Sequence, residues 1–128
     1  FFKDKNYSYI VDAIDLVTCK LDLISIAKER NIPIISSMGT GNKLNPTMLE
    51  VSDINKTSVC PLARVMRKEL KNRGIKKLKV VYSKEEPRKP QNLSGSREKK
   101  VNVGSISFVP STAGLIIASE VIKDICNL

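Results

Sequence analysis

The sequence predicts an α/β fold in which helices pack on a mixed sheet that contains parallel strands. Short runs rich in β-branched residues alternate along the chain with amphipathic segments of helical period. The first two such runs are joined by a segment long enough for a helical crossover, which makes neighbouring strands parallel. With 128 residues, 41% of them apolar and no Trp, the chain is long enough for about one domain with an aliphatic core.

The first crossover unit occupies the beginning of the chain. A short β-branched run predicts a buried strand over Tyr7–Ile14, and Val17–Arg30 is expected to be a helix. The apolar face of this helix is formed by Val17, Leu21, Ile24 and Ala27. Lys20 is placed off that face. Asn31 ends the helix, and Ile32–Ser37 is predicted to be the second, parallel strand.

The middle of the chain contains the remaining parts of the predicted sheet. The expected elements are a loop over Met38–Pro46, a short strand over Thr47–Val51, a helix over Cys60–Asn72 and a strand over Lys77–Ser83. Pro61 suits the first turn of the helix, and Gly74 follows its end. The predicted apolar stripe of this helix is formed by Leu62, Met66 and Leu70.

The end of the chain is predicted to hold a loop, a strand and a helix. Residues 84–103 are polar, basic and interrupted by proline and glycine, which indicates a mobile basic loop. The alternation over Ser105–Val109 predicts a last strand. Ser111 is expected to cap a final helix that runs to about Cys126. That helix is apolar around much of its circumference, so we expect it to pack on more than one side, and the alternative is a membrane-surface or partner-binding role.

Positive charge is concentrated in one part of the sequence. The net charge is +9, but the stretch from Arg64 to Lys100 holds fourteen Lys and Arg residues against four Glu residues. Such a local excess favours a polyanionic partner, and the alternative is an ordinary solvated face. The predicted helix over Cys60–Asn72 carries Arg64, Arg67, Lys68 and Lys71 at helical spacing.

One carboxylate is predicted at the ligand-binding edge of the sheet. Asp15 follows a strand, and in parallel α/β sheets ligands bind beyond the carboxyl ends of strands. A lone carboxylate there can hold a magnesium ion that also binds ATP phosphates. The alternative is that Asp15 is a helix N-cap. Asp12 lies inside the strand, and if it is buried it needs a partner.

The reactive side chains are few. The chain has no histidine, which excludes Ser-His or Cys-His catalytic pairs and His-ligated metals within it. Cys60 precedes Pro61 at a predicted helix start, where free N–H groups favour a reactive thiolate. Cys19 and Cys126 are predicted to be packing residues. The three unpaired cysteines, with no signal peptide or membrane-length apolar run, predict a cytoplasmic protein.

Five segments carry a resemblance to a known family. The run YIVDAID at Tyr9–Asp15 is similar to the strand of ubiquitin-activating-enzyme-like, or ThiF-type, adenylating enzymes that ends in their magnesium-binding aspartate. The run NIPII at Asn31–Ile35 is similar to their next strand. Three further segments, at Lys56–Arg64, Val80–Glu85 and Gly104–Gly114, resemble the bacterial tRNA threonylcarbamoyladenosine dehydratases.

This resemblance implies the C-terminal half of a Rossmann-like adenylating domain that uses ATP and Mg²⁺. It implies that Asp15 binds the metal, and that Ile14 and Asp15 contact the nucleotide. The activity implied is attack of a carboxylate, on an adenosine of tRNA, at the α-phosphate of ATP, followed by closure to a cyclic product. Relatives pair as homodimers, and a sulfur-transfer protein is a further possible partner. The family's Gly-rich nucleotide loop is not matched, because Gly39–Gly41 has the wrong spacing, so we expect the fragment to be inactive alone.

Two alternatives remain open. The first is adenylation of a ubiquitin-like sulfur-carrier protein, although the paired CxxC motifs of many such enzymes are absent. The second is a non-catalytic RNA-binding α/β module. Cys60 is a candidate catalytic thiol, although a dehydration by adenylation needs no thioester. The residues predicted to bind tRNA are Arg64, Arg67, Lys68, Lys71, Arg88 and Lys89.

Overall fold

The computed structural model describes residues 5–88 and 106–128, and their helices and strands follow most of the predicted pattern. In chain order the elements are β1 (Ile10–Asp12), α1 (Val17–Glu29), β2 (Ile34–Ser37), η1 (Pro46–Met48), β3 (Leu49–Asp53), η2 (Ile54–Lys56), α2 (Pro61–Asn72), β4 (Lys79–Ser83) and α3 (Phe108–Cys126). Strands β1 and β2 are shorter than predicted. The predicted loop over residues 84–103 lies outside the described residues except for its first five positions, which form no helix or strand.

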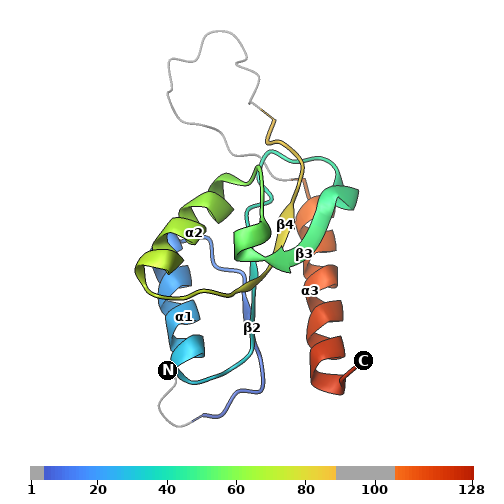
Figure 1. Ribbon diagram of the computed structural model, residues 1–128. Coiled ribbons are helices and arrows are strands. Elements are labelled where there is room, and N and C mark those ends of the chain that lie inside the picture. The colour runs from blue at the N-terminus through green and yellow to red at the C-terminus, as the bar shows by residue number, and fades with distance from the viewer. Residues whose placement is uncertain (1–4, 89–105) are drawn as a thin grey trace.

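The described strands form one mixed sheet, which confirms the predicted α/β class. Their order is β1-β2-β4-β3. Strand β1 pairs with β2 in parallel, β2 pairs with β4 in parallel, and β3 pairs antiparallel with β4. The carboxyl ends of the three parallel strands therefore meet at one edge of the sheet, which is the upper edge in Figure 1.

Helices cover both faces of the sheet. Helices α1 and α2 lie on one face, and α3 lies on the other (Figure 1). Strand β4 packs against helices on both faces of the sheet, because successive side chains of a strand point to opposite faces. Val80 belongs to the core under α1 and α2, whereas Val81 packs with Ala113 and Ile117 of α3. On the α2 side, Met66, which belongs to the predicted apolar stripe of that helix, is fully buried.

Polar contacts attach α3 to the sheet near the amino ends of the parallel strands. Lys79 Nζ of β4 lies 2.9 Å from carboxylate oxygens of both Glu120 and Asp124. The Tyr9 hydroxyl donates a hydrogen bond of 2.7 Å to Asp124. Partial burial and this hydrogen bond raise the pKa of Tyr9 to about 12. The contacts fix the C-terminal part of α3 against β4.

The predicted strand over Ser105–Val109 is wrong within the described residues. Helix α3 begins at Phe108, three residues before the expected cap at Ser111, and its N-cap residue Ser107 makes no side-chain cap hydrogen bond. Pro110 does not prevent this, because the first turn of a helix has N–H groups without intrahelical acceptors. The apparent two-residue alternation was too short to distinguish a strand from a helix start.

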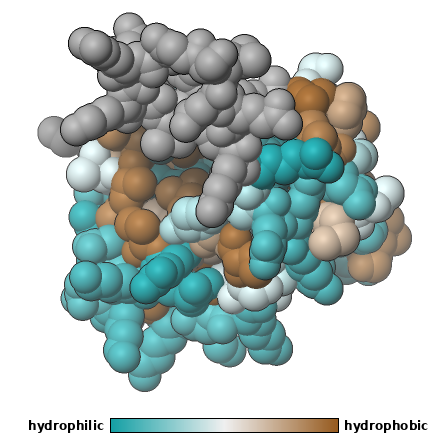
Figure 2. Space-filling model, turned by 90° about the horizontal axis from the view of Figure 1, so that it is seen from above, coloured by the Kyte–Doolittle hydropathy of each residue, from teal (hydrophilic) through white to brown (hydrophobic). Residues whose placement is uncertain are grey.

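One side of α3 remains exposed, so the prediction that it packs on more than one side is wrong in the described structure. Leu115 is 72% exposed and Ile122 is 57% exposed. In the view onto the edge where the parallel strands finish, apolar surface appears at the right, on the α3 side (Figure 2). None of the described helices is long and apolar enough to cross a membrane.

Two cysteines are not packing residues, contrary to the sequence-based prediction. Cys19 and Cys126 are both exposed. Cys19 lies on the outer side of α1, and Cys126 is the last residue of α3, beyond the helix's buried positions. Cys60 is the buried cysteine among the three.

Candidate nucleotide site at the carboxyl edge of the sheet

A buried ion pair lies directly below the predicted site. Lys20 Nζ of α1 is 2.8 Å from Asp12 Oδ2 of β1, and both side chains are 0% exposed. Ser36 of β2 donates a 2.5 Å hydrogen bond to the same carboxylate oxygen. The expectation that a buried Asp12 needs a partner is confirmed. The placement of Lys20 off the buried face is wrong, although its spacing from Val17 and Ile24 fits the apolar stripe.

The same pair holds the backbone that follows β1. Asp12 Oδ1 accepts a 3.0 Å hydrogen bond from the Ile14 N–H, and Lys20 Nζ donates a 3.2 Å hydrogen bond to the Ile14 carbonyl. Both backbone polar groups of Ile14 are therefore bound by buried side chains. Ile14 is the residue immediately before Asp15.

Asp15 lies at the carboxyl end of β1 and lines a cavity of about 220 Å³. The cavity is closed by the end of β2, by α2 and by the first turns of α3; its lining includes Ser37, Thr40, Leu62 and Pro110. The Asp15 side chain is exposed and makes no hydrogen bond or ion pair with other described residues. The N-cap alternative is wrong, because Leu16 is the N-cap residue of α1 and no side chain caps the helix.

The donor set around Asp15 suits a magnesium ion that keeps most of its water. Among residues 5–88 and 106–128, no group of three or more His, Cys, Asp or Glu side chains is placed to hold a metal. Mg²⁺ is commonly bound through one or two carboxylates together with water and substrate phosphates. A single exposed carboxylate at the mouth of a cavity fits that mode and does not fit an all-protein metal cage.

The loop after β2 forms another wall of the cavity, and Glu85 holds it in place. The Glu85 carboxylate accepts hydrogen bonds from the backbone N–H groups of Leu44 and Asn45. The Leu44 nitrogen lies 2.9 Å from Glu85 Oε1, and the Asn45 nitrogen lies 2.8 Å from Glu85 Oε2. Partial burial by itself would raise the pKa of Glu85, but the N–H groups of Asn45 and Leu44 outweigh it and lower the pKa. Glu85 was not among the predicted site residues.

Lys43 belongs to the same loop, and Cys60 lies near it. Lys43 is 2% exposed, and its Nζ donates a 3.2 Å hydrogen bond to the Ser83 carbonyl. Burial lowers the pKa of Lys43. Cys60 occupies the N-cap position of α2, as predicted, but it is only 3% exposed. This burial restricts access to the thiol, and its reactivity stays a prediction.

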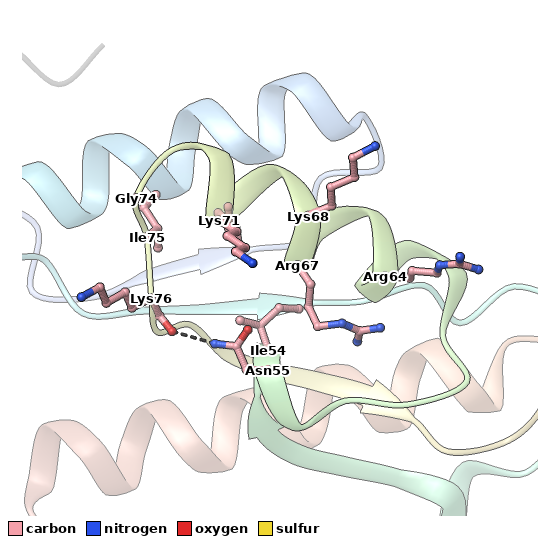
Figure 3. A pocket seen from close by; sticks show the side chains of 10 residues that line it. Ile54, Asn55, Arg64, Arg67, Lys68, Lys71, Gly74, Ile75 and Lys76 are labelled. Atoms are coloured by element: carbon pink, nitrogen blue, oxygen red, sulfur yellow. Dashed lines mark hydrogen bonds between the residues drawn. The ribbon is translucent and has the colours of Figure 1, made fainter.

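A basic groove runs along α2 and is separate from the Asp15 cavity. The groove has a volume of about 660 Å³, and its basic lining residues are Arg64, Arg67, Lys68, Lys71 and Lys76 (Figure 3). The structure thus brings together the four cations predicted at helical spacing. Arg67 points toward Ile54 in Figure 3, and its guanidinium donates to the Thr57 carbonyl at 3.1 Å and to the Thr57 hydroxyl.

The other two predicted RNA-binding residues do not join this groove. Arg88 is exposed, is not among the groove's lining residues, and donates its backbone N–H to the Asn42 carbonyl at 2.8 Å. Lys89 lies outside the described residues. Lys76, which the sequence analysis did not select, lines the groove because the turn after α2 returns beside η2. There the Asn55 amide donates a 2.7 Å hydrogen bond to the Lys76 carbonyl.

No family model matches the chain, but individual known proteins do. The tRNA threonylcarbamoyladenosine dehydratase of Bacillus subtilis (strain 168) is 39% identical over an alignment 134 positions long, which covers 97% of this chain and 53% of that protein.

Solved structures of an Escherichia coli dehydratase also match this chain. The crystal structure of Escherichia coli tRNA N6-threonylcarbamoyladenosine dehydratase with ATP matches with a TM-score of 0.83 at 30% identity, over 95% of this chain and 49% of that one. Its complex with AMP matches with a TM-score of 0.82 at 31% identity, over 94% and 49% of the two chains. This chain, which spans about half the length of those relatives, is therefore homologous to the tRNA threonylcarbamoyladenosine dehydratases along nearly all of its own length.

Proposed function

We propose that this chain forms part of an ATP-dependent tRNA threonylcarbamoyladenosine dehydratase. The observation that carries the proposal is the position of Asp15, at the carboxyl edge of a parallel sheet and at a cavity, in a chain homologous to a dehydratase solved with ATP and AMP. Two further parts of the proposal, a homodimer and a sulfur-transfer protein as a possible partner, rest on the resemblance. The cytoplasmic location rests on the unpaired cysteines.

In this proposal Asp15 would hold Mg²⁺ through its carboxylate, and Ile14 would lie against the nucleotide. The metal would supply neutralisation of phosphate charge. The loop held by Glu85 and the first turns of α3 close the cavity and limit the entry of water beside the reacting carboxylate. Attack of the carboxylate on the α-phosphate would displace pyrophosphate and form a mixed anhydride with AMP. Ring closure at the activated carbonyl would then expel AMP in place of hydroxide, so the net change in the tRNA is a dehydration.

Replacement of the carboxylate tests the proposal directly. In the full-length protein, Asp15→Ala is expected to lower the rate of adenylation by at least about a hundredfold, because the metal supplies several kcal/mol of charge stabilisation. ATP–pyrophosphate exchange at several magnesium concentrations measures this. Asp22→Ala is the matched control, because Asp22 is an exposed aspartate of α1 whose only described partner is Arg73. Normal exchange and normal magnesium dependence in Asp15→Ala would refute the assignment.

The isolated 128-residue chain is proposed to lack exchange activity. Gly39 and Thr40 line the cavity, but the segment after them is a loop and then the short helix η1, so these residues do not lead directly into a long helix as a phosphate-binding glycine loop does. The measurement is the same exchange assay on the purified chain. A rate near that of the full-length protein would show that the chain contains a complete nucleotide site.

The basic groove along α2 is proposed to bind tRNA phosphates. Its cations come from one helix and from the turn that follows it, and all of them line the same groove. This groove also suits the alternative of a non-catalytic RNA-binding module, whereas adenylation of a sulfur-carrier protein is a poorer reason for so many basic residues. The Asp15 experiment separates the first two possibilities, because only the enzyme requires that carboxylate for adenylation.

A further inference from the structure

We propose that the buried Asp12–Lys20 ion pair positions the Asp15 carboxylate for the metal–nucleotide complex, which makes Asp12 and Lys20 positioning residues. The inference rests on the proposed function of Asp15. It concerns two side chains that lie behind the site and do not line the cavity.

The backbone around Asp15 is outside the regular elements. β1 ends at Asp12 and α1 begins at Val17, so the residues between them have no sheet partner to hold them. The bonds to Ile14 replace that support, because Asp12 accepts from its N–H and Lys20 donates to its carbonyl. With both peptide groups of the preceding residue held, the direction in which the Asp15 side chain leaves the backbone is constrained.

The chemistry of the pair favours a positioning role over a purely stabilising one. Removing two charges from water is costly, and a buried ion pair is often no more stable than apolar residues of similar volume. An apolar pair, however, could form no hydrogen bond to the Ile14 backbone. The charged pair forms two such bonds, both with buried side chains whose own positions are fixed.

Ser36 extends this arrangement to the next strand. Its hydroxyl donates to Asp12 Oδ2, so the pair is tied to β2 as well as to β1 and α1. The residues that follow Ser36, Ser37 and Met38, line the same cavity as Asp15. The pair therefore fixes two walls of the site relative to one another.

The test separates positioning from folding by using a variant that keeps the core neutral. In the full-length protein, Asp12→Asn with Lys20→Met removes both charges together, and Asn retains an acceptor for the Ile14 N–H. Affinity is measured for Mn²⁺·ATP, with Mn²⁺ as a spectroscopic substitute for Mg²⁺, and for ATP in the presence of a chelator. We expect Mn²⁺·ATP to bind roughly tenfold more weakly, as for the loss of one charged hydrogen bond, with metal-free ATP unchanged.

The controls make each outcome decisive. Lys28→Met makes the same substitution as Lys20→Met, but at an exposed position of α1. It should leave the affinities for Mn²⁺·ATP and for metal-free ATP unchanged. If Asp15→Ala weakens Mn²⁺·ATP binding but the double variant does not, the positioning inference is wrong and the proposed function stands. If Asp15→Ala has no effect, the proposed function itself fails. Equal weakening of both ligands in the double variant would show general loosening of the fold and would also overturn the inference.

Discussion

The basic groove along α2 leads to a quantitative prediction for tRNA binding. The change is the triple substitution Arg64→Gln, Lys68→Gln and Lys71→Gln in the full-length protein. These three side chains line the groove and make no hydrogen bond or ion pair with other described residues, so they are free to contact phosphates. Arg67 is left in place, because its bonds to Thr57 connect α2 to the preceding segment and its loss would disturb the fold.

The magnitude follows from the number of charges removed. For single-stranded nucleic acid each phosphate contact contributes about 0.7 to the slope of log affinity against log salt. Loss of three contacts should therefore reduce that slope by about 2. Over a tenfold rise in salt concentration, the affinity of the variant should fall about 100-fold less than that of the unaltered protein.

The assay is tRNA affinity at several salt concentrations, with ATP affinity measured on the same samples. The matched control is the triple substitution Lys5→Gln, Lys28→Gln and Lys123→Gln, which removes the same charge from exposed positions away from the groove. An identical change of slope in both triple variants would mean that net charge alone is responsible. An unchanged slope in the groove variant would mean that the groove is only a solvated face and that tRNA binds elsewhere.

Two further predictions concern buried and partly buried charges. Lys20→Met alone should lower the free energy of unfolding, measured in urea, by about 3–5 kcal/mol, because it leaves Asp12 charged, buried and without its ion partner. Most of that loss should be recovered when Asp12→Asn is added. Equal losses of unfolding free energy in the single and double variants would contradict this prediction. Because the folded-state pKa of Glu85 is lowered, its contribution to stability is present above the unfolded pKa of about 4.3 and is lost as the pH falls through the folded value. The difference in unfolding free energy between the unaltered protein and Glu85→Gln should accordingly shrink in acid, and a difference that stays constant from pH 7 to acid would exclude the proposed hydrogen bonds.

The element types that the sequence predicted correctly are those with a strong local pattern. The β-branched runs, the apolar stripe of α2 and the Cys60–Pro61 start of that helix all appear as expected. The four cations of α2 also share one groove, because helical spacing alone places them on neighbouring turns. The start of α3 was mispredicted because a few alternating residues before Pro110 do not distinguish a strand from a first helical turn.

The arrangement of the candidate site could not be predicted from the sequence, because it depends on contacts between distant segments. From the sequence, Asp15 could be placed at the end of a strand, but its cavity depends on Pro110 and Gly114 of a helix almost one hundred residues away. Lys20 could be recognised as a member of the stripe by spacing, yet only the packing of α1 on β1 shows that it meets Asp12. Glu85 holds the loop at Leu44 because β4 lies beside β2 in the sheet.

By itself, the sequence determined the α/β class, the parallel pairing of β1 with β2, the carboxylate at a strand end and the concentration of basic charge on α2. These features depend on residue type and local period, which are properties of short segments. Only the tertiary structure decided which polar groups are buried together, which face of α3 is covered and which residues enclose Asp15. Those outcomes depend on contacts between distant segments, because a charge can be buried only where another element supplies its partner.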